Sequence, residues 1–199
     1  GPDILCWQTS LFIKEARDPG FVSWHQDGNY WGLSSHEVVT AWLALSPSTI
    51  ESGCMKMMPG SHLWDSVEHE DTFDKDNLLT RGQVMKQEMD EAKALDIIVA
   101  PGEISLHHVN IAHASAPNHS DDRRIGLALR YVTPRVRQVT GVPDAATLVR
   151  GEDKLGNFEM EPAPEYNMAP AAVALHERVT NTRKGFIYKD AAQTPDAAA

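Results

Sequence analysis

The chain has 199 residues, a net charge of −10 and a pI near 5.3. Hydrophobic residues make up 42% and charged residues 23%, as in an ordinary globular protein with one domain-sized core. No apolar run approaches the ~20 residues that span a bilayer, and we expect no secretory signal at the N-terminus. A surface for nucleic acid or anionic membrane would be basic, so the acidic composition argues against both partners.

Short β-prone runs separated by turn residues dominate the first two thirds of the chain. The turns include Asp18-Pro19-Gly20, Pro59-Gly60-Ser61 and Pro101-Gly102. Many short strands of this kind favour a sandwich or barrel over a fold of alternating strands and helices. The predicted strands are 4–14, 21–27, 38–45, 54–58, 96–99, 104–109 and 125–132.

Two segments depart from the β pattern. Segment 65–96 carries ten acidic and four basic residues. It is expected to be a solvated surface insertion, with a lid over a site as the alternative. Segment 169–184 is predicted to form a C-terminal helix on the outside of the sheet. The chain is expected to form one domain over 1–190, followed by a disordered tail at 191–199.

The two cysteines, Cys6 and Cys54, lie far apart and form no Cys-x-x-Cys pair. One disulfide between them is arithmetically possible, but two reduced thiols are favoured. We therefore expect a cytoplasmic protein, and the sequence leaves its oligomeric state open.

Three His-x-Asp pairs are candidates for a metal site, at 25–27, 69–71 and 119–121. On a strand, residues i and i+2 project to the same face, so such a pair can present an imidazole and a carboxylate together. The first pair lies in a β-prone run, the second in the acidic segment and the third in a polar turn. Because metal ligands need a rigid, packed support, only His25 and Asp27 are predicted to bind a metal.

Segment 104–132 is predicted to supply the third ligand. Its pattern indicates a hairpin in which strand 104–114 turns and returns along 123–132. His113 would then lie opposite Arg124, with both side chains on one face. Two imidazoles and one carboxylate suit Fe(II), because they leave positions open for O2 and a chelating cosubstrate. An arginine beside that metal suits a dicarboxylate, whose remote carboxylate it can bind in bidentate fashion.

Neighbours on these strands extend the predicted pocket. A Ser115 hydroxyl can add a hydrogen bond to the same carboxylate. Gly126 and Ala128 follow on the Arg124 face and are small enough to leave room for a ligand. Arg130 shares that face as well, but we expect it to pair with an acidic neighbour.

Some other residues have packing as their favoured role. His108 is the alternative third ligand, but an imidazole in the core or beside the metal ligands is favoured. Tyr30 and Trp31 are expected to pack, although both could reach the mouth of a barrel.

Several motifs occur in one order along the chain. They are Trp24-His25-Gln26-Asp27, Pro59-Gly60-Ser61-His62, Gly102-Glu103, the run 113–118 and the run 123–131. From about residue 1 to 133 this set resembles the phytanoyl-CoA dioxygenase family. The resemblance implies a mainly β, double-stranded β-helix (a cupin-like jelly roll). It also implies oxidation driven by 2-oxoglutarate, with Fe(II) and O2, that releases succinate and CO2.

By the same resemblance, His25, Asp27 and His113 match the metal ligands, and Arg124 matches the clamp for the 2-oxoglutarate carboxylate. Further positions that flank the cosubstrate match Gln26, Trp42 and Ser115. Related halogenases carry a small residue in place of Asp27. The presence of Asp27 in this chain therefore indicates a hydroxylase, which would act on an aliphatic C–H bond of a small molecule.

Family members usually carry an N-terminal region before the strand that begins here, so we expect the chain to lack that part. The alternative is a catalytically impaired or non-enzymatic jelly-roll domain that binds metal. A cupin-type enzyme that uses no 2-oxoglutarate is a third reading, and Arg124 argues against it.

Overall fold

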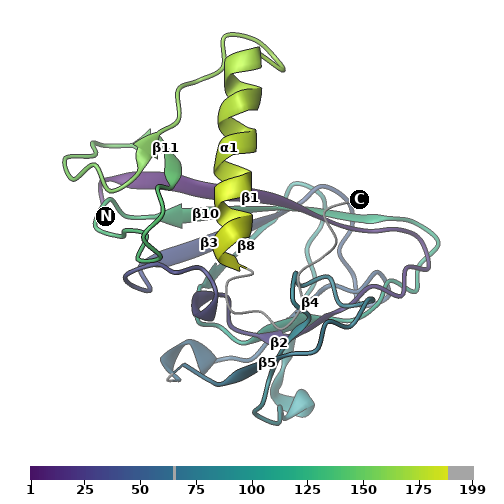
Figure 1. The fold of residues 1–199 in the computed structure, drawn as a ribbon. Coiled ribbons are helices and arrows are strands. Elements are labelled where there is room, and N and C mark those ends of the chain that lie inside the picture. Colours follow the sequence, from purple (N-terminus) through teal and green to yellow (C-terminus); the bar gives the residue numbers. More distant parts are fainter. Residues whose placement is uncertain (65, 188–199) are drawn as a thin grey trace.

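A computed structural model describes residues 1–64 and 66–187, so the predicted disordered tail at 191–199 lies outside the described residues. Within these ranges the chain is mainly β, as predicted, with a C-terminal helix (Figure 1). Three short 3-10 helices lie at Asp27–Asn29, Ser61–Leu63 and Glu91–Lys93. The longer elements are β1 (Ile4–Lys14), β2 (Val22–His25), β3 (Val38–Ala44), β4 (Met55–Met57), β5 (His69–Asp71), β6 (Gln83–Met85), β7 (Leu95–Ile97), β8 (Ile104–His108), β9 (His113–Ser115), β10 (Arg124–Val132), β11 (Ala145–Arg150), β12 (Glu159–Met160) and α1 (Pro170–Ile187).

Two facing sheets make up the scaffold. A six-stranded sheet has the order β12-β11-β1-β10-β3-β8, and a four-stranded sheet has the order β2-β9-β4-β7. Along the chain the strands pass from one sheet to the other, and every pairing from β1 to β10 is antiparallel. This is the topology of a jelly roll, so the predicted double-stranded β-helix is confirmed.

The six-stranded sheet buries polar side chains among apolar ones on its inner face and leaves large apolar side chains exposed on its outer face. Along β10 the even-numbered residues from Arg124 to Val132 are buried, and the residues between them are partly exposed. On the outer face, Leu11 is 59% exposed and Leu106 is 71% exposed. The alternation that made these strands recognisable therefore directs charged and small side chains inward, where they surround a cavity of about 220 Å³.

The predicted hairpin between 104–114 and 123–132 is wrong. The chain turns at Val109 and Asn110, so β8 ends at His108 and His113 begins β9 in the other sheet. β9 pairs with β2 and β4, whereas β10 lies between β1 and β3. The prediction assumed one uninterrupted strand, whereas the turn after β8 carries β9 into the opposite sheet, and the chain returns to the six-stranded sheet only at β10.

The acidic insertion is more ordered than the favoured prediction of a solvated loop. Its described part contains β5 and β6, which form a small two-stranded sheet, and β7, which joins the four-stranded sheet. Residues Leu78, Leu79, Thr80 and Gln83 of this insertion line the cavity. The insertion therefore forms part of the cavity wall, in agreement with the alternative of a cover over the site.

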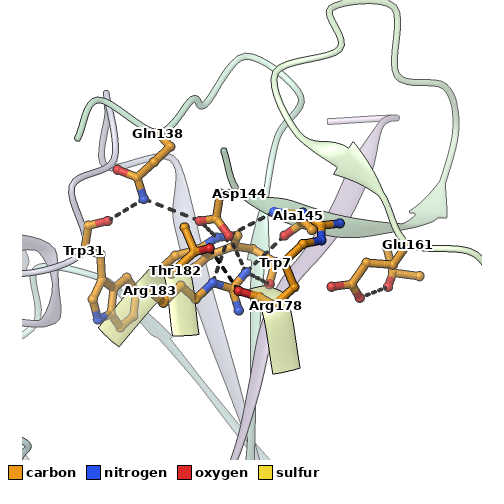
Figure 2. A network of polar contacts seen from close by, with 10 residues as sticks. Trp7, Trp31, Gln138, Asp144, Ala145, Glu161, Arg178, Thr182 and Arg183 are labelled. Carbon is orange, nitrogen blue, oxygen red and sulfur yellow. Dashed lines mark hydrogen bonds and ion pairs between the residues drawn. The ribbon is translucent and has the colours of Figure 1, made fainter. Parts of the chain in front are cut away.

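The predicted C-terminal helix is present as α1, and its second half is tied to the six-stranded sheet (Figure 2). Arg183 donates hydrogen bonds to Asp144 Oδ1 (2.8 Å) and to the backbone carbonyls of Trp7 and Ala145 (both 3.0 Å). Trp7 Nε1 also donates to Asp144 (2.7 Å), and the Arg183 guanidinium lies 5.2 Å from the Trp7 ring. Arg183 also lines the cavity, so the helix reaches further inward than the outside position predicted for it.

No helix in the described ranges is long and apolar enough to cross a membrane. Cys6 and Cys54 are both free thiols.

Candidate metal centre and cosubstrate pocket

His25, Asp27 and His113 come together at one point inside the jelly roll. One potential ligand atom from each residue lies within 4.8 Å of the others. His25 is the last residue of β2 and His113 the first of β9, and the two are paired across these strands. Asp27 follows β2 in a 3-10 turn rather than on the predicted strand, and this turn carries its carboxylate back to 3.5 Å from His25 Nε2.

Both imidazoles are oriented by their own backbone. The Nδ1 atoms of His25 and His113 lie 2.9 Å from the Ser23 carbonyl and 3.0 Å from the Ile111 carbonyl, respectively. A carbonyl can only accept, so Nδ1 carries the proton and Nε2 presents its lone pair. This is the arrangement in which metal-ligating histidines are usually held.

The electrostatics of the cluster also fit a cation. Burial by itself would raise the pKa of Asp27. Its contacts with His25 and His113 and the nearby charge of Arg130 instead hold that pKa well below its usual range. Burial and the neighbouring His25 lower the pKa of His113 to about 3. At neutral pH the cluster therefore offers an anionic carboxylate and a neutral His113 imidazole, as metal coordination requires.

Arg124 lies at one end of the same cavity, 2% exposed. Its Nη1 donates to the Gly53 carbonyl (3.1 Å), while its Nε is buried without a hydrogen-bond partner among the described residues. Burial lowers the pKa of Arg124 to about 10, so the guanidinium remains charged at neutral pH. A buried cation with spare donors fits a carboxylate ligand. The Trp42 ring, 5.4 Å from the guanidinium carbon, forms the adjacent wall.

Ser115 also lines the cavity and is held by a buried lysine that we did not predict. Lys14 pairs with Arg124 across β1 and β10, and its Nζ donates to Ser115 Oγ (2.8 Å) and to the Ala116 carbonyl. Burial and the neighbouring Arg124 charge lower the pKa of Lys14 to about 7. Lys14 therefore fixes the strand segment that follows His113.

Gln26 lies behind the metal cluster and is not among the residues that line the cavity. Its side chain is 1% exposed, donates to the Asn110 carbonyl (3.0 Å) and accepts from the Val67 backbone N–H (3.1 Å). Its own backbone N–H donates to His69 Nε2 (3.0 Å). Gln26 thus joins the β8–β9 turn to the insertion and braces the metal cluster from behind.

The other histidine candidates lie elsewhere. His69 lies on β5, where its Nε2 accepts a hydrogen bond from the backbone N–H of Gln26. His119 lies in the exposed turn that follows β9. His108 is not among the cavity residues, and its Nδ1 accepts from the Asn110 backbone N–H (3.1 Å). The preceding residue, His107, does face the cavity, with its ring 5.2 Å from that of His113. The alternation along β8 could have identified His107 as a cavity residue only if it had been known that the face of β8 opposite to Leu106 points inward.

Arg130 also contradicts our prediction of an acidic partner. It lines the cavity, and no ion pair involves it in the part of the chain that the structure describes. Tyr30 and Trp31 line the cavity too, so they reach the site in addition to packing. The sequence did contain a signal for the position of Arg130, because Arg130 and Arg124 are six residues apart and therefore project from the same face of β10.

The fold and the clustered side chains define a jelly-roll protein with a candidate His-Asp-His metal centre. A family model for phytanoyl-CoA dioxygenase (PhyH) matches residues 2–126. The match covers more than half of the chain, which therefore belongs to the phytanoyl-CoA dioxygenase family.

The chain is similar to three proteins with related descriptions. A probable alpha-ketoglutarate-dependent hypophosphite dioxygenase of Stutzerimonas stutzeri is 29% identical over 113 residues, which cover 55% of this chain and 39% of that protein. The apo structure of the non-heme monooxygenase ThoJ is 37% identical, with a TM-score of 0.84, over 95% of this chain and 68% of that one. A structure of CytC3 with Fe(II) and alpha-ketoglutarate is 25% identical, with a TM-score of 0.57, over 81% of this chain and 62% of that one.

ThoJ has also been solved as a nickel complex, which is 36% identical to this chain with a TM-score of 0.76.

The chain spans about two fifths of the length of the Stutzerimonas relative, of which the match covers 39%.

Proposed function

We propose that the chain is the core of an Fe(II)- and 2-oxoglutarate-dependent dioxygenase that hydroxylates an aliphatic C–H bond of a small molecule. In the balanced reaction, substrate, 2-oxoglutarate and O2 give the hydroxylated substrate, succinate and CO2. The observation that carries the proposal is the convergence of two sites in one cavity. His25, Asp27 and His113 form a cluster there, and the buried Arg124 lies within the same walls.

The metal centre would be held by the three clustered side chains. His25 and His113 would present Nε2 and Asp27 its carboxylate, a set of donors that suits Fe(II) and would leave coordination positions for other ligands. When bound, Fe(II) with 2-oxoglutarate supplies the oxidative decarboxylation of the cosubstrate that is coupled to hydroxylation. The presence of a carboxylate at position 27 supports hydroxylation over halogenation, because it fills the position that a halide would need.

The cosubstrate would lie between the metal centre and Arg124. The guanidinium provides N–H donors for the remote carboxylate, and Trp42 limits how far the guanidinium can move. Ser115 lies within the same walls, and its hydroxyl is fixed by Lys14. These residues orient one end of a dicarboxylate, so that its other end faces the metal ligands.

The walls of the cavity would shield the reaction from water. The insertion contributes Leu78 and Leu79, and the opposite wall contributes Trp31. Exclusion of bulk water strengthens the ionic contacts inside and protects reactive species. We further propose that residues 1–190 act as one oxygenase domain, and that the protein works in the cytoplasm, where the free thiols of Cys6 and Cys54 would stay reduced.

The test is succinate formation from 2-oxoglutarate, measured by mass spectrometry with Fe(II), O2 and a panel of small molecules. We expect succinate that depends on at least one panel member, and its loss in His113→Ala and Asp27→Ala. His119→Ala and Asp121→Ala are matched controls, because they come from the His-x-Asp pair outside the cavity and Asp121 only pairs with Arg17 at the surface. Wild-type succinate yields in both site variants would refute the assignment. Iron binding without succinate across the panel would favour the non-enzymatic alternative.

A further inference from the structure

A second buried arginine faces the cavity at a distance from the cosubstrate end. Arg130 lies six positions after Arg124 on β10 and is 7% exposed. Its Nη1 donates to Ser10 Oγ (3.0 Å), and its Nε is buried without an acceptor among the described residues. A guanidinium carries several N–H donors and stays charged at neutral pH, so this cation has donors to spare.

The guanidinium of Arg130 is held in place by aromatic rings rather than by carboxylates. Its carbon lies 4.9 Å from the centre of the Trp31 ring and 6.0 Å from that of Phe12. Burial lowers the pKa of Arg130, and the Asp27 charge opposes this effect. Aromatic faces fix the plane of the guanidinium but accept none of its N–H groups in the manner of an oxyanion. The donors therefore remain available to a ligand.

Arg130 belongs to a row of polar residues across the inner face of the sheet. Gln8 pairs with Arg130, Arg130 with Thr40, and Thr40 with His107, on the successive strands β1, β10, β3 and β8. All four line the cavity. Thr40 Oγ1 and His107 Nδ1 are, like Arg130 Nε, buried without a hydrogen-bond partner in the described part of the chain. Native proteins satisfy such groups with protein, water or ligand atoms, so three on adjacent strands offer a ready set of polar contacts for a bound ligand.

That ligand is distinct from the cosubstrate. At a strand rise of ~3.3 Å per residue, the Cα atoms of Arg124 and Arg130 are about 20 Å apart. Ala128 and the Trp42 ring line the cavity between the two ends. One 2-oxoglutarate that is bound to Arg124 and to the metal cluster leaves Arg130 without a partner.

We propose that Arg130, with Thr40 and His107, forms an anion subsite that recognises a carboxylate or another oxyanion on the substrate. The substrate of this enzyme is then an acidic small molecule, anchored by its charged group on the far side of the metal from Arg124. Its uncharged part lies against Trp31 and Phe12, which presents a C–H bond to the metal centre. This inference rests on the proposed function for the location of metal and cosubstrate.

The experiment uses the full chain, loaded with Ni(II) and saturating 2-oxoglutarate so that no turnover occurs. Pentanoate and its neutral isostere pentanamide are titrated in by ligand-observed NMR. In wild type we expect pentanoate to bind about tenfold more tightly than pentanamide, as a charge-assisted contact would give. In Arg130→Gln the two probes should bind within about twofold of each other, with the affinity for 2-oxoglutarate nearly unchanged. Arg135→Gln is the matched control, since Arg135 is exposed and its ion pair within residues 1–64 and 66–187 is with Glu37 at the surface.

Equal binding of the two probes in wild type would overturn the inference, as would a preference that survives in Arg130→Gln. So would a loss of 2-oxoglutarate affinity in Arg130→Gln as large as in Arg124→Gln, because Arg130 would then serve the cosubstrate. If Arg130→Gln does not fold, Arg130→Lys decides. It should weaken pentanoate selectively, and an equal effect or no effect on the two probes contradicts the subsite. Failure of Ni(II) and 2-oxoglutarate to bind at all, before any probe is added, would instead refute the proposed function.

Discussion

Gly126 is the position at which the smallest substitution should disturb the cosubstrate end of the cavity. A Cβ added at Gly126 would lie 1.9 Å from Trp42 Cζ2, 2.2 Å from Cε2 and 2.6 Å from Cη2. Ordinary carbon–carbon contacts lie at about 3.5–4.0 Å, so the indole must move by roughly 1.6 Å. Trp42 is 3% exposed and packed against Ala44, Met55 and Ala128, which leaves it little room to do so.

The magnitude for Gly126→Ala follows from two effects. Overpacking a filled core costs about 1–3 kcal/mol, and alanine returns about 0.5–1 kcal/mol through reduced backbone entropy in the unfolded chain. We therefore expect a net loss of about 1–2 kcal/mol in the free energy of unfolding. Movement of Trp42 away from Arg124 also frees the guanidinium, and ordering it again on binding would cost about 1 kcal/mol and raise the Kd for 2-oxoglutarate about fivefold.

The assay combines urea unfolding with a 2-oxoglutarate titration of the metal-loaded protein. Gly185→Ala is the control, because Gly185 lies in α1 with open space around its position and should be neutral or slightly stabilised. A Gly126→Ala protein as stable as wild type, with unchanged affinity for 2-oxoglutarate, would show that Trp42 does not form the wall described above.

Lys14→Met should remove a pH dependence of stability. Burial lowers the pKa of Lys14 to about 7 in the folded protein, below its value in the unfolded chain. The contribution of neutral Lys14 to the free energy of unfolding is therefore fully present above the unfolded pKa and is lost as pH falls through about 7. Urea unfolding between about pH 7 and 10 should show wild type gaining on Lys14→Met by up to ~1.4 kcal/mol per pH unit, and parallel curves would contradict this. Arg183→Met should cost about 3 kcal/mol in the same assay, because Asp144 loses its buried charge partner. The exposed control Arg178→Gln should cost less than about 1 kcal/mol, and equal costs would refute the anchoring of α1.

The local part of the site was predictable from the sequence. His25 and Asp27 are two positions apart, and a rigid strand before a tight turn suffices to bring them together. The strand 4–14 was predicted with its observed bounds, although a bulge between Cys6 and Gln8 shifts the alternation of its buried residues. Features that depend on a few consecutive residues were within reach of periodicity and turn chemistry.

Features that depend on pairing between distant strands were not. The predicted hairpin brought His113 and Arg124 into one cavity through the wrong register, because a jelly roll places its sequential strands in opposite sheets. Lys14 was missed because its burial arises from its pairing with Arg124 across more than a hundred residues.

The usual rule for sidedness also failed on the large sheet. Leu106 faces outward and His107 inward, since the inner face carries buried polar side chains around the cavity beside its apolar core. Periodicity alone identifies two faces of a strand and does not say which one is inside.

The most direct test of the metal centre is an anaerobic titration of the protein with Fe(II) and 2-oxoglutarate, followed by visible absorption. The chelate of 2-oxoglutarate on Fe(II) gives a weak charge-transfer band, which we expect to saturate at one Fe(II) per chain. The band should be absent in His113→Ala, and in Arg124→Gln it should require much more 2-oxoglutarate. A wild-type protein without the band, or a His113→Ala protein that retains it, would contradict the site proposed here.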